Sequence, residues 1–299
     1  MNKLSVVINT LNEEENIKKA ILSVGKIAGE IVVVDMHSSD NTVEIAKSMG
    51  AIVYKHKKTG YVEPARNFAI SKAKGDWILI LDADEVVSIG LSKKLSSIIK
   101  NPKYDYYRIP RKNIIFGKWI KNVRWWPDYN IRLFKKGMVT WNEVIHSVPF
   151  TEGDGTDLDA KESNAITHYH YQSISQYLTR LDRYTDEHAK NLIKEGYGFR
   201  WKDLFNKPIS EFVSRYFFGK GYKDGLHGLV LSGLQTFSEF VLYVKTWEKK
   251  GFKEENVKVE NVIDEMKLSF KNFYYWWADV LVKEKGGITN KIKRKLKLP

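Results

Sequence analysis

The sequence predicts an α/β fold with a mostly parallel sheet, followed by a helical C-terminal region. Over the first hundred residues, short apolar runs rich in β-branched residues alternate with segments whose apolar residues recur at helical spacing. Such alternation is typical of parallel strands joined by crossover helices. From Ser173 onward the pattern is mainly helical, with glycine and proline breaks near residues 196–208 and 219–228. We therefore expect two domains, over residues 1–170 and 171–299.

The N-terminal elements follow in order along the chain. Each expected strand is a short apolar run, which suits a strand buried on both faces. The strands are expected at residues 4–9, 31–34, 51–54 and 77–81, and the helices at 13–24, 43–49 and 64–73. Residues 104–150 are β-rich and aromatic, and residues 151–164 form a polar, turn-rich loop.

Polar clusters follow three of the four expected strands. They are Asn9 to Asn12, Asp35 to Ser39, and Asp82 to Asp84. Ligands of open α/β sheets bind beyond the carboxyl ends of the strands. The three clusters therefore predict one polar rim at which a ligand binds.

The Asp82-Ala83-Asp84 segment gives the sharpest chemical signal. Two carboxylates one residue apart at a strand end can both reach a hard divalent cation, Mn²⁺ or Mg²⁺, which would bridge a diphosphate. The alternative is a solvated turn before the next helix. The position directly after a buried strand favours the metal.

Composition and charge exclude several classes of function. The chain has 299 residues and no cysteine, which excludes disulfides, thiolate metal sites and a cysteine nucleophile. Its formal charge of +13 attracts polyanions such as nucleotides or an anionic membrane. Neither a signal peptide nor a run of about 18 apolar residues occurs, so we expect a cytoplasmic protein. Without GxGxxG or a Walker lysine motif, dinucleotide and P-loop sites are disfavoured.

Three motifs occur in order over roughly residues 3–90: SVVINTLNEEENI, EIVVVDMHSSDNTVEIAKSMGA and ARNFAISKAKGDWILILDADE. Together they resemble glycosyltransferase family 2, whose fold is GT-A. More loosely, RLFKKG, WNEVIHSV and HYHYQSISQYLTRLDRYT resemble a bacterial branch with lipopolysaccharide-core glucosyltransferase-like proteins.

The resemblance implies a set of donor-binding residues. Thr10, Asn12 and Glu13 would line the nucleotide pocket, and Asp35 would contact the base, with Ser38 in the same loop. Arg66 and Asn67 would lie on a helix that faces the donor. Asp82 and Asp84 would bind the ribose and the metal. Three of these have structural alternatives. Asp35 would then organise its own loop, Arg66 would be a salt-bridge partner, and Asn67 a polar residue of the helix surface.

An inverting transfer also needs a base near the acceptor hydroxyl. Glu143 in WNEVIH is our first candidate and Asp128 in WWPDYN the second. His146 is expected either to ligate the metal or a phosphate, or to be structural. The branch often has an acid directly after this histidine, where this chain has Ser147.

His168 and His170 alternate as in a strand and share one face. They could pair at a metal, but no third ligand has suitable spacing.

The predicted reaction is transfer of a sugar, as implied by the resemblance, from a nucleoside diphosphate donor, with uridine diphosphate favoured. The acceptor would be a glycan or a lipid-linked molecule of cell-envelope polysaccharide synthesis. We expect peripheral binding to an anionic membrane at its inner face, through residues 212–250 and the basic tail 291–297, and no nucleic-acid partner. The alternatives are a nucleotidyltransferase and a basic membrane- or nucleic-acid-binding module without chemistry.

Overall fold

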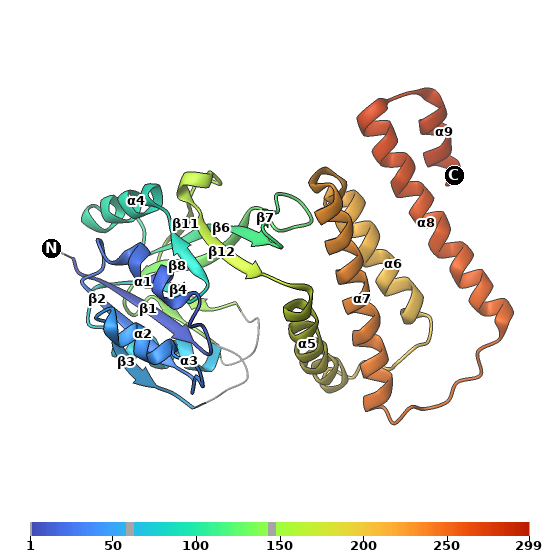
Figure 1. Cartoon of the computed structure of the whole chain (residues 1–299). Coiled ribbons are helices and arrows are strands. Elements are labelled where there is room, and N and C mark those ends of the chain that lie inside the picture. Colours follow the sequence, from blue (N-terminus) through green and yellow to red (C-terminus); the bar gives the residue numbers. More distant parts are fainter. Residues whose placement is uncertain (1, 58–62, 143–147, 299) are drawn as a thin grey trace. The chain divides into compact units, whose positions relative to one another are not determined.

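The computed structural model describes residues 2–57, 63–142 and 148–298. The chain forms two compact units: a sheet unit, Met1–Ile114 with Trp126–His170, and a helical unit, Ile115–Trp125 with Tyr171–Pro299 (Figure 1). The predicted fold class, a mostly parallel α/β sheet followed by C-terminal helices, is confirmed. The domain limits 1–170 and 171–299 stay a prediction, and residues 115–125 pack within the helical unit.

The N-terminal elements lie within a few residues of their predicted positions. The strands are β1 (Leu4–Thr10), β2 (Glu30–Asp35), β3 (Ile52–Lys55) and β4 (Trp77–Asp82), and the helices are α1 (Ile17–Val24), α2 (Thr42–Ser48) and α3 (Glu63–Lys72). A fourth helix, α4 (Ile89–Lys100), was not among the predicted elements. The β1–β2, β1–β4 and β2–β3 pairs are all parallel. Thr10 is opposite Asp35, and Asn9 is opposite Asp82. The three polar strand ends are therefore side by side, as predicted.

The chain after β4 extends the same sheet, mostly with antiparallel strands. The strands of this part are β5 (Glu85–Val87), β6 (Tyr106–Ile115), β7 (Lys118–Trp119), β8 (Asp128–Lys135), β9 (Val139–Thr140), β10 (Phe150–Thr151), β11 (Gly155–Asp157) and β12 (Ile166–Tyr171). Two of them, β9 and β10, form a separate two-stranded sheet, and β11 pairs with β6 in parallel. Across the described residues the main strand order is β3-β2-β1-β4-β8-β6-β12-β5. β8 runs antiparallel to both β4 and β6. Side chains from β6, β8 and β12 thereby join the sheet that carries the polar rim.

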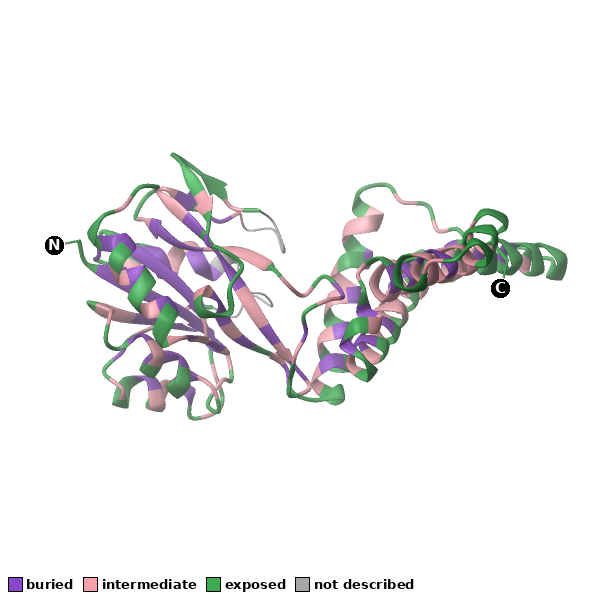
Figure 2. Cartoon of the chain, turned by 90° about the horizontal axis from the view of Figure 1, so that it is seen from above, coloured by how far each residue is buried: buried purple, intermediate pink, exposed green. Residues whose placement is uncertain are grey.

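Two apolar layers bury the sheet, because successive strand residues face opposite sides. Val6, Ile8 and Leu79 pack in a cluster with α1 and α4, whereas Val7 and Ile78 pack in a second cluster with α3. The strands β1, β2 and β4 are accordingly buried along most of their length, whereas β3 is not (Figure 2). The apolar core thus holds the parallel strands in place, and the polar side chains of the rim lie at the carboxyl ends of these strands.

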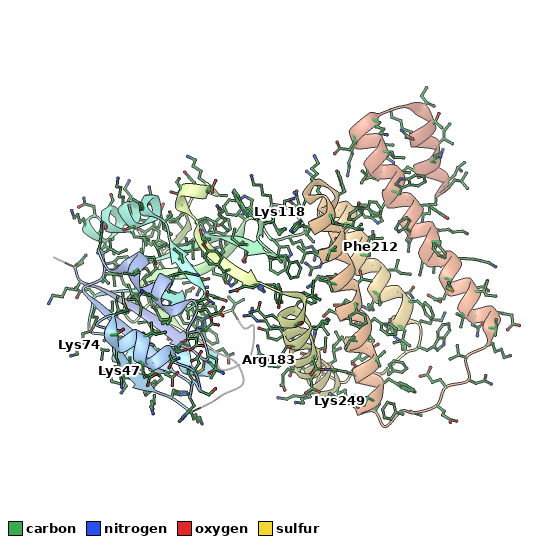
Figure 3. The ribbon with its side chains drawn as sticks, in the orientation of Figure 1. Lys47, Lys74, Lys118, Arg183, Phe212 and Lys249 are labelled. Carbon is green, nitrogen blue, oxygen red and sulfur yellow. The ribbon has the colours of Figure 1, made fainter. Side chains whose placement is uncertain are left out.

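The helical unit consists of long helices with aromatic contacts. They are α5 (Ile174–Lys194), α6 (Asp203–Val213), α7 (Leu226–Lys249), α8 (Val259–Lys285) and α9 (Ile288–Leu296). Phe212 of α6 (Figure 3) stacks on Phe273 of α8, with ring centroids 6.3 Å apart. None of the described helices combines the length and apolar character needed to cross a membrane.

A glycine of α7 permits one close backbone approach within this unit. A Cβ atom at Gly228 would lie 1.8 Å from the carbonyl oxygen of Gly221. Only glycine leaves room for that carbonyl, so the identity of residue 228 determines how α7 packs on the preceding turn.

Candidate functional site

The end of β1 carries two buried polar side chains that other described residues satisfy only in part. The amide nitrogen of Asn9 donates to the carbonyl oxygen of Ala65 at 3.2 Å. The Oδ1 atom of Asn9 and the Oγ1 atom of Thr10 are buried without a hydrogen-bond partner among the described residues. Because an unsatisfied buried polar atom costs free energy, these two atoms favour a polar ligand at the rim.

The loops after β1 and β2 are joined by hydrogen bonds between their predicted ligand-binding residues. The backbone N–H of Asn12 donates to Oγ of Ser38 at 2.8 Å, and Oδ1 of Asn12 accepts from the backbone of Ser39 at 2.8 Å. The N–H of Glu13 donates to Oγ1 of Thr42, also at 2.8 Å. The structure thus brings Asn12, Glu13 and Ser38 together beside Thr10.

Asp35 organises the turn that follows β2. Its carboxylate is almost fully buried and accepts from the backbone N–H groups of His37 and Ser38, each at 3.1 Å. His37 has a positive φ of 65°, which the turn requires. Asp35 therefore organises its own loop, which is the structural role considered for it above. Its contact with a nucleotide base stays a prediction.

Asp82 lies between two arginines. Its Oδ1 atom accepts from Nη2 of Arg66 at 2.9 Å, and its Oδ2 atom accepts from Nη2 of Arg132 at 2.7 Å. Burial opposes ionisation of this carboxyl group, but the charges of Arg132 and Arg66 outweigh it and hold the pKa of Asp82 well below its ordinary value. Asp82 is therefore ionised, and Arg66 is a salt-bridge partner of Asp82.

A second, fully buried acid continues this network. Glu85 pairs with Arg132 and, at 3.5 Å, with Arg111, whose Nη2 atom also lies 2.7 Å from Oδ2 of Asp128. Burial raises the pKa of Glu85, and the nearby charge of Asp82 adds to this. Sequence reasoning missed Glu85, Arg111 and Arg132. For Glu85 the available signal was its place beside two valines in β5, whereas β6 and β8 carry several other polar residues and gave no such signal for Arg111 and Arg132.

A directed chain of hydrogen bonds leads from Asp128 to His168, which lies beside Asp84. The ionised Asp128 only accepts, so the amide nitrogen of Asn113 faces its Oδ2 atom, at 3.0 Å. The Oδ1 atom of Asn113 must then face Nδ1 of His168, at 2.7 Å, which places a proton on Nδ1. In a neutral ring the Nε2 atom consequently carries a lone pair, and it lies 3.5 Å from Oδ2 of Asp84.

Asp84 and His168 together fit a divalent cation. A carboxylate oxygen and an imidazole lone pair suit Mn²⁺, and a hydrogen bond to the second ring nitrogen is the usual support of a histidine ligand. No cluster of three or more His, Asp or Glu side chains suited to a metal occurs among the described residues. Two protein ligands suffice where substrate phosphates complete the coordination. Asp82 differs from Asp84, because both of its oxygens already accept from arginines.

The two histidines of β12 lie together, as their alternation predicts. The ring centroids of His168 and His170 are 4.7 Å apart. The His168 ring lies beside Asp84, with its Nε2 atom 3.5 Å from Oδ2 of that residue.

Of the two candidate bases, Asp128 lies among the described residues and Glu143 does not. Asp128 bonds to Arg111, Asn113 and Asn130. Burial opposes its ionisation, but the charge of Arg111 and the bond from Asn113 prevail and lower the pKa of Asp128, which makes it a weaker base. Glu143 lies outside the described residues, as does the predicted metal ligand His146. Both assignments stay predictions.

Asn67 holds the backbone of Trp141. Its amide nitrogen donates to the carbonyl oxygen of Trp141 at 2.7 Å, and its Oδ1 atom accepts from the N–H of Trp141 at 2.9 Å. The neighbouring Arg66 has its guanidinium carbon 5.8 Å from the centre of the Trp141 ring. The Asn67 amide is therefore engaged with the protein, and its contact with a donor stays a prediction.

Comparison with known proteins assigns the family. The model of Glycosyl transferase family 2 matches residues 5–151. An uncharacterized glycosyltransferase of Rickettsia typhi is 33% identical over 273 residues, covering 88% of this chain and 91% of the relative. Another, of Rickettsia conorii, is 30% identical over 270 residues, covering 87% and 93%. The crystal structure of S. aureus TarS 1–349 in complex with UDP is 14% identical, covers 86% of this chain and 94% of TarS 1–349, and has a TM-score of 0.44. By its family match and its Rickettsia relatives, the chain belongs to glycosyl transferase family 2, and it is a glycosyltransferase rather than a nucleotidyltransferase or a binding module without chemistry.

Proposed function

We propose that this glycosyltransferase moves a sugar, with inversion, from a nucleoside diphosphate donor bound at the ends of β1, β2 and β4. One observation carries the proposal: an arginine with an unused donor lies at this rim. The Nη1 atom of Arg66 is buried without a hydrogen-bond partner among the described residues, while Nη2 is held by Asp82. Guanidinium groups are well suited to phosphate oxygens. A diphosphate would satisfy this donor.

The other rim residues divide the remaining contacts with the donor. Thr10 and Asn12 would line the nucleotide pocket with Glu13 and Ser38, and Asp35 would contact the base. Asp82, kept ionised by its arginines, would accept from a ribose hydroxyl. Family resemblance favours uridine as the base.

Asp84 and His168 would hold the divalent cation, Mn²⁺ or Mg²⁺. When bound, such an ion neutralises charge on a leaving diphosphate. Arg66 would stabilise the same charge from the protein side, because its guanidinium is already fixed by Asp82 and needs no reorganisation. His146, a further predicted ligand, would add to this set.

Direct displacement at the sugar requires removal of a proton from the acceptor hydroxyl. Glu143 would take this proton, because Asp128 is tied to Arg111 and has a lowered pKa. The acceptor would be a glycan or a lipid-linked molecule of cell-envelope polysaccharide synthesis, at the inner face of the cell membrane. The looser resemblance to lipopolysaccharide-core enzymes supports this class of acceptor.

Donor hydrolysis tests the proposal directly. The purified chain is incubated with a panel of nucleotide sugars, with Mn²⁺, with Mg²⁺ or with a chelator, and release of nucleoside diphosphate is measured. We expect release from at least one uridine diphosphate sugar, dependent on the cation and abolished in Asp84→Ala. Asp157→Asn is the matched control, since Asp157 forms an exposed ion pair with Arg108. Full activity of Asp84→Ala in chelator would contradict the metal assignment.

A further inference from the structure

The last helix packs on its neighbour through polar side chains. Arg294 of α9 donates to Oδ1 of Asp279 on α8, with an N–O distance of 2.9 Å. The Nζ atom of Lys293 lies 5.5 Å from the centre of the Trp277 ring. Lys293 and Arg294 are also less exposed than the residues on either side of them. This polar face therefore holds α9 against α8.

The apolar residues of α9 consequently face away from α8. Ile288, Ile292 and Leu296 follow at intervals of four and form one stripe, and their exposed fractions are 76%, 50% and 58%. The ribbon near the C-terminus is largely exposed (Figure 2). A surface helix of a globular protein normally turns such a stripe toward the core. In α9 the orientation is inverted, so the stripe is available to a partner.

Cationic side chains border the exposed stripe. At 100° per residue, Lys291 and Lys295 lie between Arg294 and Ile288, on the flank of the stripe opposite Lys293. Lys297 follows directly after the helix. Lys291, Lys295 and Lys297 form no ion pair within the described part of the chain, and residues 286–298 contain no acid. The partner of this face must therefore accept apolar side chains and positive charge together.

We propose that α9 binds the surface of an anionic lipid bilayer, with its apolar stripe among the headgroups and its lysines at the lipid phosphates. Helices with an apolar face and lysines beside it bind in this way. A nucleic acid would leave the apolar stripe exposed to water. A second copy of the chain would oppose lysine to lysine. This inference concerns where the enzyme binds and does not rest on the proposed donor or metal.

The test uses the full chain and vesicles of phosphatidylcholine, with and without phosphatidylglycerol. At low salt we expect flotation with the anionic vesicles only. Ile288→Ser/Ile292→Ser/Leu296→Ser should lower vesicle partitioning at least tenfold at every salt concentration. Lys291→Gln/Lys295→Gln should lower it about 25-fold at low salt, since each lysine near an anionic surface contributes about fivefold, or about 1 kcal/mol. The lysine effect should fade at high salt.

A matched control distinguishes binding through the apolar stripe of α9 from binding through exposed apolar residues elsewhere on the surface. Val259→Ser/Ile263→Ser/Met266→Ser removes three exposed apolar residues of α8 and should leave partitioning unchanged. All variants are checked by thermal unfolding and by donor hydrolysis in solution, which should stay at the wild-type level. The proposal is overturned if the intact chain ignores anionic vesicles at low salt, or if the control weakens binding equally. It is also overturned if the α9 triple variant binds vesicles normally and instead loses self-association by light scattering.

Discussion

The Nη2 atom of Arg132 lies 2.7 Å from Oδ2 of Asp82, and the same atom also contacts the fully buried Glu85. One guanidinium nitrogen thus serves two acids, one at the end of β4 and one at the start of β5. Its position on β8 is possible because β8 runs antiparallel beside β4.

Removal of Arg132 should destabilise the sheet unit. In Arg132→Met, Glu85 loses its buried counter-charge, and breaking a buried ion pair on one side costs about 3–5 kcal/mol. Urea unfolding should show this loss. Arg108→Gln, which breaks the exposed pair with Asp157, should cost no more than about 1 kcal/mol. Equal losses in the two variants would contradict the importance of burial here.

Asn113 should support the cation site without touching the cation. Asn113→Leu frees the Nδ1 side of His168, and loss of such a supporting hydrogen bond typically costs about 10–100-fold in metal affinity. The Mn²⁺ concentration that gives half-maximal donor hydrolysis should rise by that factor.

Asn130→Leu serves as the control for Asn113, because Asn130 bonds to the other oxygen of Asp128, whereas the bond to Nδ1 of His168 comes from Asn113. Its Mn²⁺ requirement should stay near wild type. An unchanged requirement in Asn113→Leu would show that His168 is not a ligand.

Replacement of the first candidate base should separate chemistry from binding. Glu143→Gln keeps size and hydrogen bonding but removes the base, so turnover should fall by about a hundredfold or more. Donor affinity, measured by calorimetry, should barely change. Turnover near wild type would transfer the role to Asp128 and leave Glu143 structural.

Two glycines of α7 should respond oppositely to alanine. Gly228→Ala places a methyl group against the carbonyl of Gly221 and should destabilise the helical unit by about 1–3 kcal/mol or more. Gly233→Ala meets no atom within 4 Å apart from the neighbouring backbone of its own helix, and it should stabilise α7 by up to about 1 kcal/mol, since alanine favours helix. Thermal unfolding of both variants decides, and destabilisation by Gly233→Ala would contradict the packing described for α7.

The parallel strands and their polar ends were predictable from the sequence. Three of the four parallel strands, β1, β2 and β4, are apolar runs with an acid or amide at or next to their last residue, namely Asn9, Asp35 and Asp82. Parallel pairing then brings those ends together without further information. The predicted helices of this region were confirmed for the same reason, because their apolar spacing differs from that of the strands.

The partners of these residues were not predictable from local patterns. Arg132 is 50 residues from Asp82, and Asn113 is 55 from His168. Only the antiparallel insertion of β8 and β6 brings them together, and no short-range spacing encodes that register. Similarly, the sequence of residues 291–297 showed that the tail is basic. It did not show which face of α9 would contact α8.

The shared nitrogen of Arg132 also has an evolutionary consequence. A change at Asp82, Glu85 or Arg132 alone leaves an unmatched charge inside the protein, so single replacements at these positions should be selected against. Replacements that alter an acid and its arginine together preserve the balance. Among relatives of this chain, these positions should therefore vary jointly or not at all, whereas the exposed pair of Arg108 and Asp157 should drift independently.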